Sequence, residues 1–266
     1  MAGGGGEVRP RCPVGHAWID VISYVDAVDR IVDLARTHDG RRHVVVTPNI
    51  HHIVELEHNP RFRSAYANAA LVVPDGAPVA RAVGLLAGRR QPRIAGSDLV
   101  DDVCHAAAAA GLTVGLLGGQ PGAGEAAARR LREGDARLRV TLVEPAPHGF
   151  ENDARERQRI IDDVRRSDPD ILLVGLGAPK QEIFADEHAA ELGGGVAVCV
   201  GAAIDFTGGA ATRAPRLWRR LGLEWLWRTA QEPRRLAPRY AVAAPRFVRI
   251  VAPSVVRALL GRRRSG

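Results

Sequence analysis

The chain has few cysteines and no long apolar stretch, and these absences narrow its class. Only three of its 266 residues are cysteine, and Cys12, Cys104 and Cys199 show no paired spacing. This argues against a disulfide framework or a zinc cluster and fits a reducing, cytoplasmic setting. No run reaches the roughly 18 apolar residues of a membrane span, and neither solenoid-length repeats nor low-complexity blocks occur.

The beginning of the chain also lacks an apolar core. Residues 1–12 are rich in glycine and contain no apolar stretch of seven or more residues. We therefore expect no signal peptide and predict a disordered tail over residues 1–16.

Acidic residues are scarce in one part of the chain. From residue 213 to the end there are 14 arginines, no lysine and only two glutamates, which gives a net charge of +12. Residues 1–212 carry −5, so the overall +7 belongs to the last segment alone. Such a segment favours an acidic partner: an anionic membrane surface, a nucleic acid or a phosphorylated ligand.

What the chain does contain is a repeated pattern of short apolar runs with helical segments between them. Continuous runs of this kind are typical of strands buried on both faces of a parallel sheet. The runs cover residues 44–47, 71–74, 113–117, 140–143, 171–176 and 196–201. Helices are predicted over residues 25–37, 97–110, 125–133 and 154–166, the second opening with Ser97 as its cap.

These elements predict an α/β fold: a doubly wound, mainly parallel sheet with helices on both faces over residues 17–212. Residues 213–266 read as a basic helical appendage. Because prolines stand at positions 233, 238, 245 and 253, we expect several short helices there, not one.

Polar residues and glycines follow the apolar runs. In open parallel sheets ligands bind beyond the carboxyl ends of the strands, so these residues predict a crevice for a polar ligand. Its glycine turns would let backbone N–H groups approach a diphosphate. The candidates are Thr47, Asn49, Asp75, Gly118, Gly119, Lys180 and Gln181.

Two further patterns offer alternatives. Gly122, Gly124 and the acidic Glu144 20 residues later fit a dinucleotide-binding signature, so a NAD(P)-dependent oxidoreductase remains an alternative. Asp168 and Asp170 match the D-x-D pattern of metal-dependent sugar transferases, but they precede an apolar run and should lie at the opposite edge of the sheet. We therefore expect no catalytic metal and no cofactor.

Four strings in order along the chain resemble the WecG/TagA/CpsF glycosyltransferase family from about residue 17 to 250. They are Thr47-Pro48-Asn49, Leu71-Val72-Val73-Pro74-Asp75-Gly76, Gly175-Leu176-Gly177-Ala178-Pro179-Lys180-Gln181-Glu182, and Arg213-Ala214-Pro215 with residues 221–228. The resemblance implies an inverting, metal-independent enzyme at the inner face of the cell membrane. It would move a hexose or N-acetylhexosamine, such as N-acetylmannosamine, from a UDP-sugar to a polyprenyl-diphosphate-linked acceptor. Such reactions build teichoic acid, exopolysaccharide and other cell-wall or surface polymers.

The resemblance also implies residue roles. Asp75 matches the family's proposed catalytic base, and Thr47, Asn49 and Gln181 match polar residues of its pocket. Arg228 and Arg235 match arginines that the appendage contributes to the site. Two departures stand out: Trp227 replaces a common tyrosine, and Pro238 stands where a basic residue is frequent, with Arg239 next to it.

A third class of function also fits the composition. Trp218, Trp225 and Trp227 lie among the arginines of the last segment, so an arginine-rich nucleic-acid-binding protein is conceivable. Binding of nucleic acid by the last segment would leave the polar crevice of the acidic core without a role. We therefore expect a partner other than nucleic acid.

Overall fold

The computed structural model describes residues 9–215, 217–218, 222–231 and 233–263. Its centre is a six-stranded sheet in which every pairing is parallel, in the order β4-β3-β8-β7-β5-β6. The strands are β3 (His43–Val46), β4 (Leu71–Val72), β5 (Thr113–Gly118), β6 (Arg139–Glu144), β7 (Ile171–Gly175) and β8 (Val196–Cys199). All six predicted strands are confirmed.

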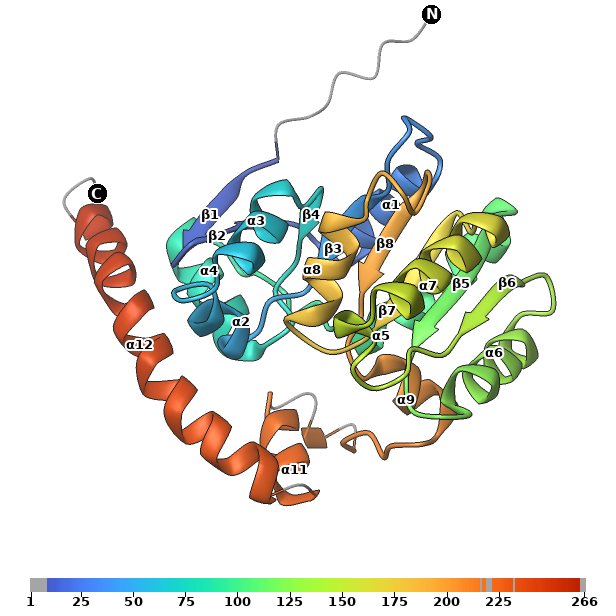
Figure 1. Ribbon diagram of the computed structural model, residues 1–266. Helices are drawn as coiled ribbons and strands as arrows, with labels where there is room; N and C mark the ends of the chain where they lie inside the picture. The colour runs from blue at the N-terminus through green and yellow to red at the C-terminus, as the bar shows by residue number, and fades with distance from the viewer. Residues whose placement is uncertain (1–8, 216, 219–221, 232, 264–266) are drawn as a thin grey trace, which may run out of the picture.

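Helices cover both faces of this sheet (Figure 1). One face packs against α1 (Tyr24–Ala35), α5 (Gly96–Ala110), α6 (Ala123–Gly134) and α9 (Ala203–Gly208). The other packs against α2 (Ile50–Glu55), α3 (Pro60–Asn68), α4 (Ala77–Ala87), α7 (Ala154–Ser167) and α8 (Lys180–Glu187), with the short 3-10 helix η1 (Phe150–Asn152) before α7.

Successive strand residues serve opposite faces, which is why the apolar runs are continuous. In β7, Leu172 and Val174 join one core while Ile171 and Leu173 join the other. All four side chains are buried. The predicted doubly wound α/β arrangement is thus present, built around two apolar layers.

The predicted disordered tail is wrong over part of its length. Strand β1 (Arg11–Val14) pairs antiparallel with β2 (Ala17–Asp20) as a hairpin. The apolar side of the hairpin packs into the core through Val14 and Ile19. The buried carboxylate of Asp20 accepts a hydrogen bond from Arg11 at 3.0 Å and another from the backbone N–H of Val72 at 2.8 Å. These contacts fix the hairpin beside β4.

Two predictions about helix ends and breaks are also wrong. Helix α5 begins at Gly96 with Ala95 as its N-cap, so Ser97 does not cap it. The appendage forms α11 (Glu224–Gln231) and then one long helix, α12 (Pro233–Arg263), which contains Pro238, Pro245 and Pro253. The prolines do not divide it because all three are exposed, while the opposite side of the helix is held against the core.

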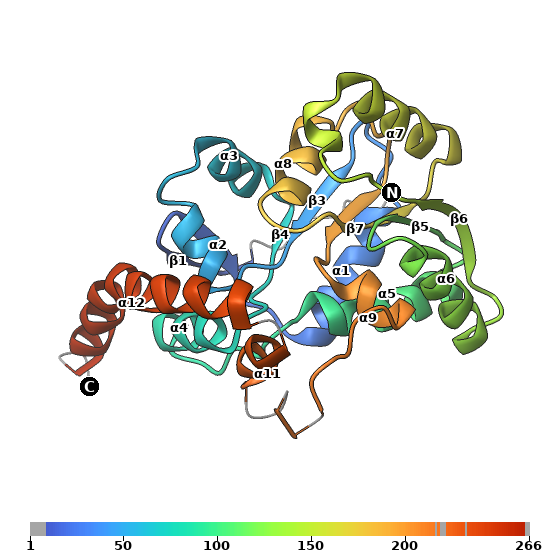
Figure 2. The ribbon, with the colours of Figure 1, turned by 60° about the horizontal axis from the view of Figure 1, so that its bottom comes forward.

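The packed side of α12 carries the buried residues Leu236, Ala243, Phe247 and Val251. They lie against α2, α4 and the β1–β2 hairpin. Figures 1 and 2 both place α12 along α2 and α4, on the side of the molecule away from α6 and α7. No helix in the described part of the chain is both long enough and apolar enough to cross a membrane.

Candidate active site

The carboxyl ends of five strands open into a single cleft of about 1090 Å³. This is slightly above the usual range of small-molecule sites, roughly 300–1,000 Å³. Residues that follow β3, β4, β5, β7 and β8 line it, and α11 and the start of α12 close the other side. The cleft therefore lies where an open parallel sheet is expected to bind ligands.

Most of the predicted site residues meet in this cleft. Thr47, Asn49, Asp75, Gly119 and Gln181 all line it. They come from separate parts of the chain, and the parallel strands bring them to one edge of the sheet.

Two of these side chains are held by the backbone around them. The hydroxyl of Thr47 donates a hydrogen bond to the carbonyl of Cys199 at 3.0 Å, which joins the ends of β3 and β8. Asn49 caps α2, its side-chain oxygen accepting from the N–H of His51 at 2.9 Å. Both side chains are therefore positioned before any ligand arrives.

Other predicted residues do not line the cleft. The ammonium of Lys180 forms an ion pair with Glu151 instead. Gly118 lies behind Gly119 and packs against the backbone of Gly175. Arg228 and Arg235 fall in α11 and α12, but their side chains lie outside the described part of the structure.

Two backbone donors of the loop that follows β5, which was expected to approach a diphosphate, are used within the protein. The N–H of Gly119 donates to the carbonyl of Gly175 at 3.1 Å, and the N–H of Gln120 donates to Asp205 at 2.7 Å. A Cβ at Gly119 would lie 2.9 Å from Ile204. Glycine is required there for close packing, and these two amides are already used.

Gln181 belongs to a buried polar network with Glu182, His52 and Tyr66, which sequence reasoning did not single out; of these three, His52 also lines the cleft. The amide of Gln181 donates to Glu182 at 2.8 Å and its oxygen accepts from the N–H of Gly201 at 3.1 Å. Nδ1 of His52 lies 2.7 Å from the hydroxyl of Tyr66 and 3.9 Å from Glu182. The network fixes the direction of the Gln181 amide.

Burial sets the protonation states of this network. Desolvation raises the pKa of Glu182 to about 7 and, together with the charges of Arg239 and His51, lowers the pKa of His52 to about 3. The second carboxyl oxygen of Glu182 has no hydrogen-bond partner in the described part of the chain. Below about pH 7, therefore, Glu182 is mostly protonated and lies near a neutral imidazole.

Arg93 is a second feature that sequence reasoning missed. It lines the cleft and donates to Glu224 at 2.8 Å and to Asp98 at 3.1 Å. Burial alone would lower the pKa of Arg93. The hydrogen bond to Glu224 and the charge of Asp75 raise it by more than this, so the pKa of Arg93 lies above its ordinary value. Arg93 thus places a permanent positive charge near Asp75.

Aromatic rings tie the appendage to the site. His51 packs on Tyr240 with ring centroids 4.6 Å apart, and Tyr240 packs on Trp225 at 5.3 Å. Tyr240, Trp225 and Arg239 line the cleft from the appendage side. The appendage therefore forms part of the cleft wall.

The chain as a whole matches one family of enzymes. A family model described as "Glycosyl transferase WecG/TagA/CpsF family" matches residues 12–264. The chain belongs to the WecG/TagA/CpsF glycosyltransferase family. It is therefore a glycosyltransferase of cell-surface polysaccharide synthesis, as the sequence resemblance implied.

Membership of the WecG/TagA/CpsF family agrees with the surroundings of the alternative motifs. Neither Gly122 nor Gly124 is among the described residues that line the cleft, and Glu144 is paired with Arg159 at 2.7 Å. Asp170 precedes β7 and accepts from the backbone N–H of Thr113 at 2.7 Å, at the edge opposite the cleft. The dinucleotide and D-x-D patterns thus serve helix starts and strand ends.

Proposed function

We propose that the enzyme transfers a hexose or N-acetylhexosamine from a UDP-sugar to a polyprenyl-diphosphate-linked sugar, with inversion at the anomeric carbon. Asp75 takes the proton from the acceptor hydroxyl as its oxygen attacks that carbon. The bond from the carbon to the UDP oxygen breaks, and UDP leaves. The observation that carries this proposal is the position of Asp75 beyond the end of β4, in the same cleft as Arg93 and the appendage residue Arg239.

The leaving diphosphate needs positive charge, which we assign to arginines. A guanidinium can bind two phosphate oxygens at once. We assign this task to Arg228 and Arg235. Arg239 lines the cleft from α12 and stands next to Pro238, where a basic residue was expected.

We propose further that the reaction uses no metal ion. Among the described residues, no group of three or more histidine, cysteine, aspartate or glutamate side chains is placed to hold one. Arginines supply the charge stabilisation that a divalent ion would otherwise provide.

Replacing the base tests the proposal directly. Asp75→Asn should lower turnover about 10²–10⁴-fold because only proton transfer is removed. Binding of UDP, measured by calorimetry, should stay close to that of the unaltered enzyme. Asp162→Asn, a change of the same kind at an exposed position of α7, serves as the control and should leave turnover unchanged. Near-normal turnover of Asp75→Asn would remove the base from the proposal.

A further inference from the structure

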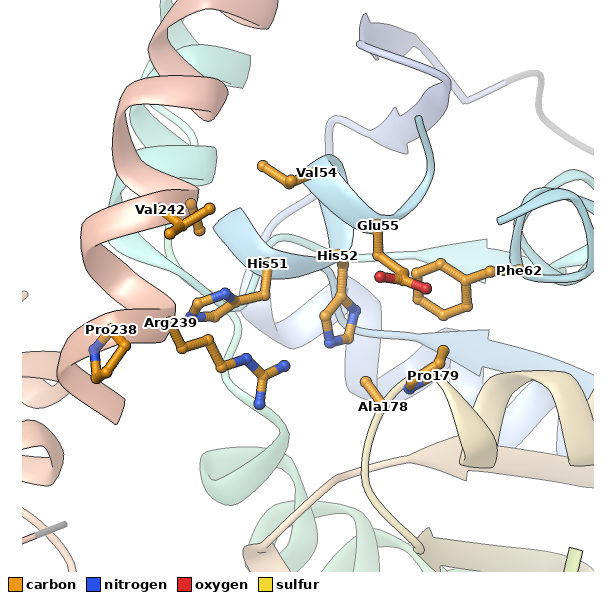
Figure 3. A pocket seen from close by; sticks show the side chains of 11 residues that line it. His51, His52, Val54, Glu55, Phe62, Ala178, Pro179, Pro238, Arg239 and Val242 are labelled. Carbon is orange, nitrogen blue, oxygen red and sulfur yellow. The ribbon is translucent and has the colours of Figure 1, made fainter. Parts of the chain in front are cut away.

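A second, smaller pocket lies between α2 and α12 and is shown in Figure 3. Its volume is about 340 Å³. We call it the α2–α12 pocket. It is lined by His51, His52, Val54, Glu55, Phe62, Ala178, Pro179, Pro238, Arg239, Val242 and Ala243.

The α2–α12 pocket adjoins the catalytic cleft. Three residues, His52, Ala178 and Arg239, line both spaces. Figure 3 shows Arg239 reaching from α12 with its guanidinium toward His52 and Ala178. A molecule bound in the cleft could therefore continue past Arg239 into the pocket.

The chemistry of the pocket changes from one end to the other. Phe62, Pro179, Val54, Val242 and Ala243 make its walls largely apolar. The cation, Arg239, stands at the shared end, next to the cleft. The carboxylate of Glu55 accepts a hydrogen bond from Asn59 at 2.9 Å and lies on the far side of His52 from Arg239. The lining suits a ligand that is anionic at one end and hydrocarbon beyond it.

We propose that the α2–α12 pocket binds the first isoprene units of the lipid-linked acceptor, while Arg239 holds the phosphate at their junction. This assignment rests on the proposed function, because it gives the acceptor's diphosphate and lipid separate places beside the donor cleft.

The outer side of α12 continues the path. Val242 lines the pocket and is still half exposed, and Leu260 follows it about five helical turns later on the same side. Val256 is exposed close to that line. Arg246 and Arg249 are exposed near the same line between these residues, so an isoprenoid that leaves the pocket at Val242 would meet apolar side chains interrupted by arginines.

Narrowing the pocket tests the assignment. Val242→Trp should fold normally because Val242 is 52% exposed. Two soluble acceptors would be compared: the same sugar diphosphate carrying either a methyl group or a three-isoprene farnesyl chain. In the unaltered enzyme the farnesyl acceptor should have a KM lower by about tenfold or more, and Val242→Trp should remove this preference. The KM of the UDP-sugar and the turnover on the methyl acceptor should not change.

The chain offers a matched control in Val248. It is 60% exposed on the same helix and does not line the pocket. Val248→Trp adds the same bulk and should keep the farnesyl preference. If Val242→Trp keeps the preference, or if Val248→Trp loses it equally, the pocket does not hold the lipid.

A binding measurement separates this proposal from the proposed function. Farnesyl diphosphate and inorganic diphosphate would be titrated against the full chain without donor. Val242→Trp should weaken the binding of farnesyl diphosphate by about tenfold and leave the binding of inorganic diphosphate unchanged. If these binding results are obtained but no sugar is transferred from any UDP-sugar, the proposed reaction is wrong and the assignment of the pocket to the lipid is still supported. If transfer is normal but farnesyl diphosphate binds equally to both proteins, the pocket assignment alone fails.

Discussion

At the scale of single residues, the position of Gln181 in the cleft wall depends on a neighbouring acid whose pKa is raised by burial. Glu182 is fully buried, accepts a hydrogen bond from Gln181 and lies against the neutral imidazole of His52. An ionised carboxylate in this position would lack the partners that normally compensate burial of a charge. Burial therefore favours the protonated form of Glu182, and this effect outweighs the hydrogen bond from Gln181, which favours the ionised form.

This state makes stability depend on pH. Because the pKa of Glu182 is raised to about 7 in the folded protein, the folded state binds more protons than the unfolded state between about pH 4.5 and 7. Its contribution to the free energy of unfolding is thus present at low pH and is lost as pH rises through this window. Glu182→Gln mimics the protonated acid and does not lose this contribution. As the pH rises from 5 to 8, the free energy of unfolding of Glu182→Gln should therefore increase relative to that of the unaltered protein by up to about 3 kcal/mol. Urea unfolding at several pH values measures the difference.

The neighbouring histidine, His52, makes stability depend on pH in the opposite direction, but its effect is the same in both proteins and cancels when they are compared. The pKa of His52 is lowered to about 3, so its stabilising contribution is lost as pH falls from about 6.5 toward 3. Both proteins contain His52, and only the difference between them reports on Glu182. Parallel stability curves from pH 5 to 8 would mean that Glu182 is ionised in the folded state.

The sequence predicted those site residues that depend on local rules. Asp75 and Gln181 lie in the segments that follow β4 and β7, so knowing that the sheet is parallel was enough to expect them at one edge. Arg93 follows no strand, and its place is set by Glu224, which is 131 positions away in the chain. His52 and Glu182 adjoin predicted site residues, but their importance comes from burial and mutual contact, which the sequence alone does not reveal.

At the scale of elements, apolar periodicity predicted the sheet and failed at the two ends of the chain. The hairpin of β1 and β2 was missed because Arg11–Val14 contains no apolar run, and its pairing depends on packing beside β4. Helix α12 was expected to break because each internal proline removes a backbone hydrogen bond. Burial of Phe247 and its neighbours on the opposite side offsets that loss, and exposed prolines allow a helix to bend around a core.

The carboxyl end of β5 permits a prediction about backbone packing. Gly118 has φ +93°, and a Cβ there would lie 2.7 Å from the carbonyl oxygen of Gly175. Gly122, at the start of α6, has φ +78° and nothing within 4 Å. Gly122→Ala should therefore lower the free energy of unfolding by about 1–2 kcal/mol, and Gly118→Ala by about 3 kcal/mol or more, because β7 must also move. Urea unfolding measures both losses.

Comparing Gly118→Ala with Gly122→Ala separates the cost of a positive φ angle, which both variants have, from the cost of the clash with Gly175, which only Gly118→Ala has. Gly175 lines the cleft, so Gly118→Ala should also weaken UDP binding, whereas Gly122→Ala should not. Equal losses of stability in the two variants would show that the end of β5 yields without disturbing β7.

At the scale of the whole molecule, charge is divided between two parts that lie side by side. Residues 1–212 carry a net −5 and residues 213–266 a net +12. Helix α12 presents the exposed Arg246, Arg249 and Arg257 together with exposed valines and leucines. We propose that residues 213–266 act as a membrane-associating appendage, with this side of α12 resting on an anionic lipid surface. The exposed apolar residues are suited to enter the interface between head groups and acyl chains.

Vesicle binding tests this orientation. Each arginine near an anionic surface contributes about 1 kcal/mol, so changing Arg246, Arg249 and Arg257 together to glutamine should lower partitioning into vesicles rich in anionic phospholipid by about 100-fold. The same change at Arg155, Arg165 and Arg166, three exposed arginines of α7 on the far side of the molecule, alters the net charge equally. Because a peripheral contact depends on where charge lies, these α7 variants should bind nearly as well as the unaltered protein. If both triple variants lose binding to the same extent, overall charge and not α12 governs attachment. Neutral vesicles should bind none of the three proteins appreciably, and strong binding there would mean that apolar insertion, not arginine, holds the enzyme to the membrane.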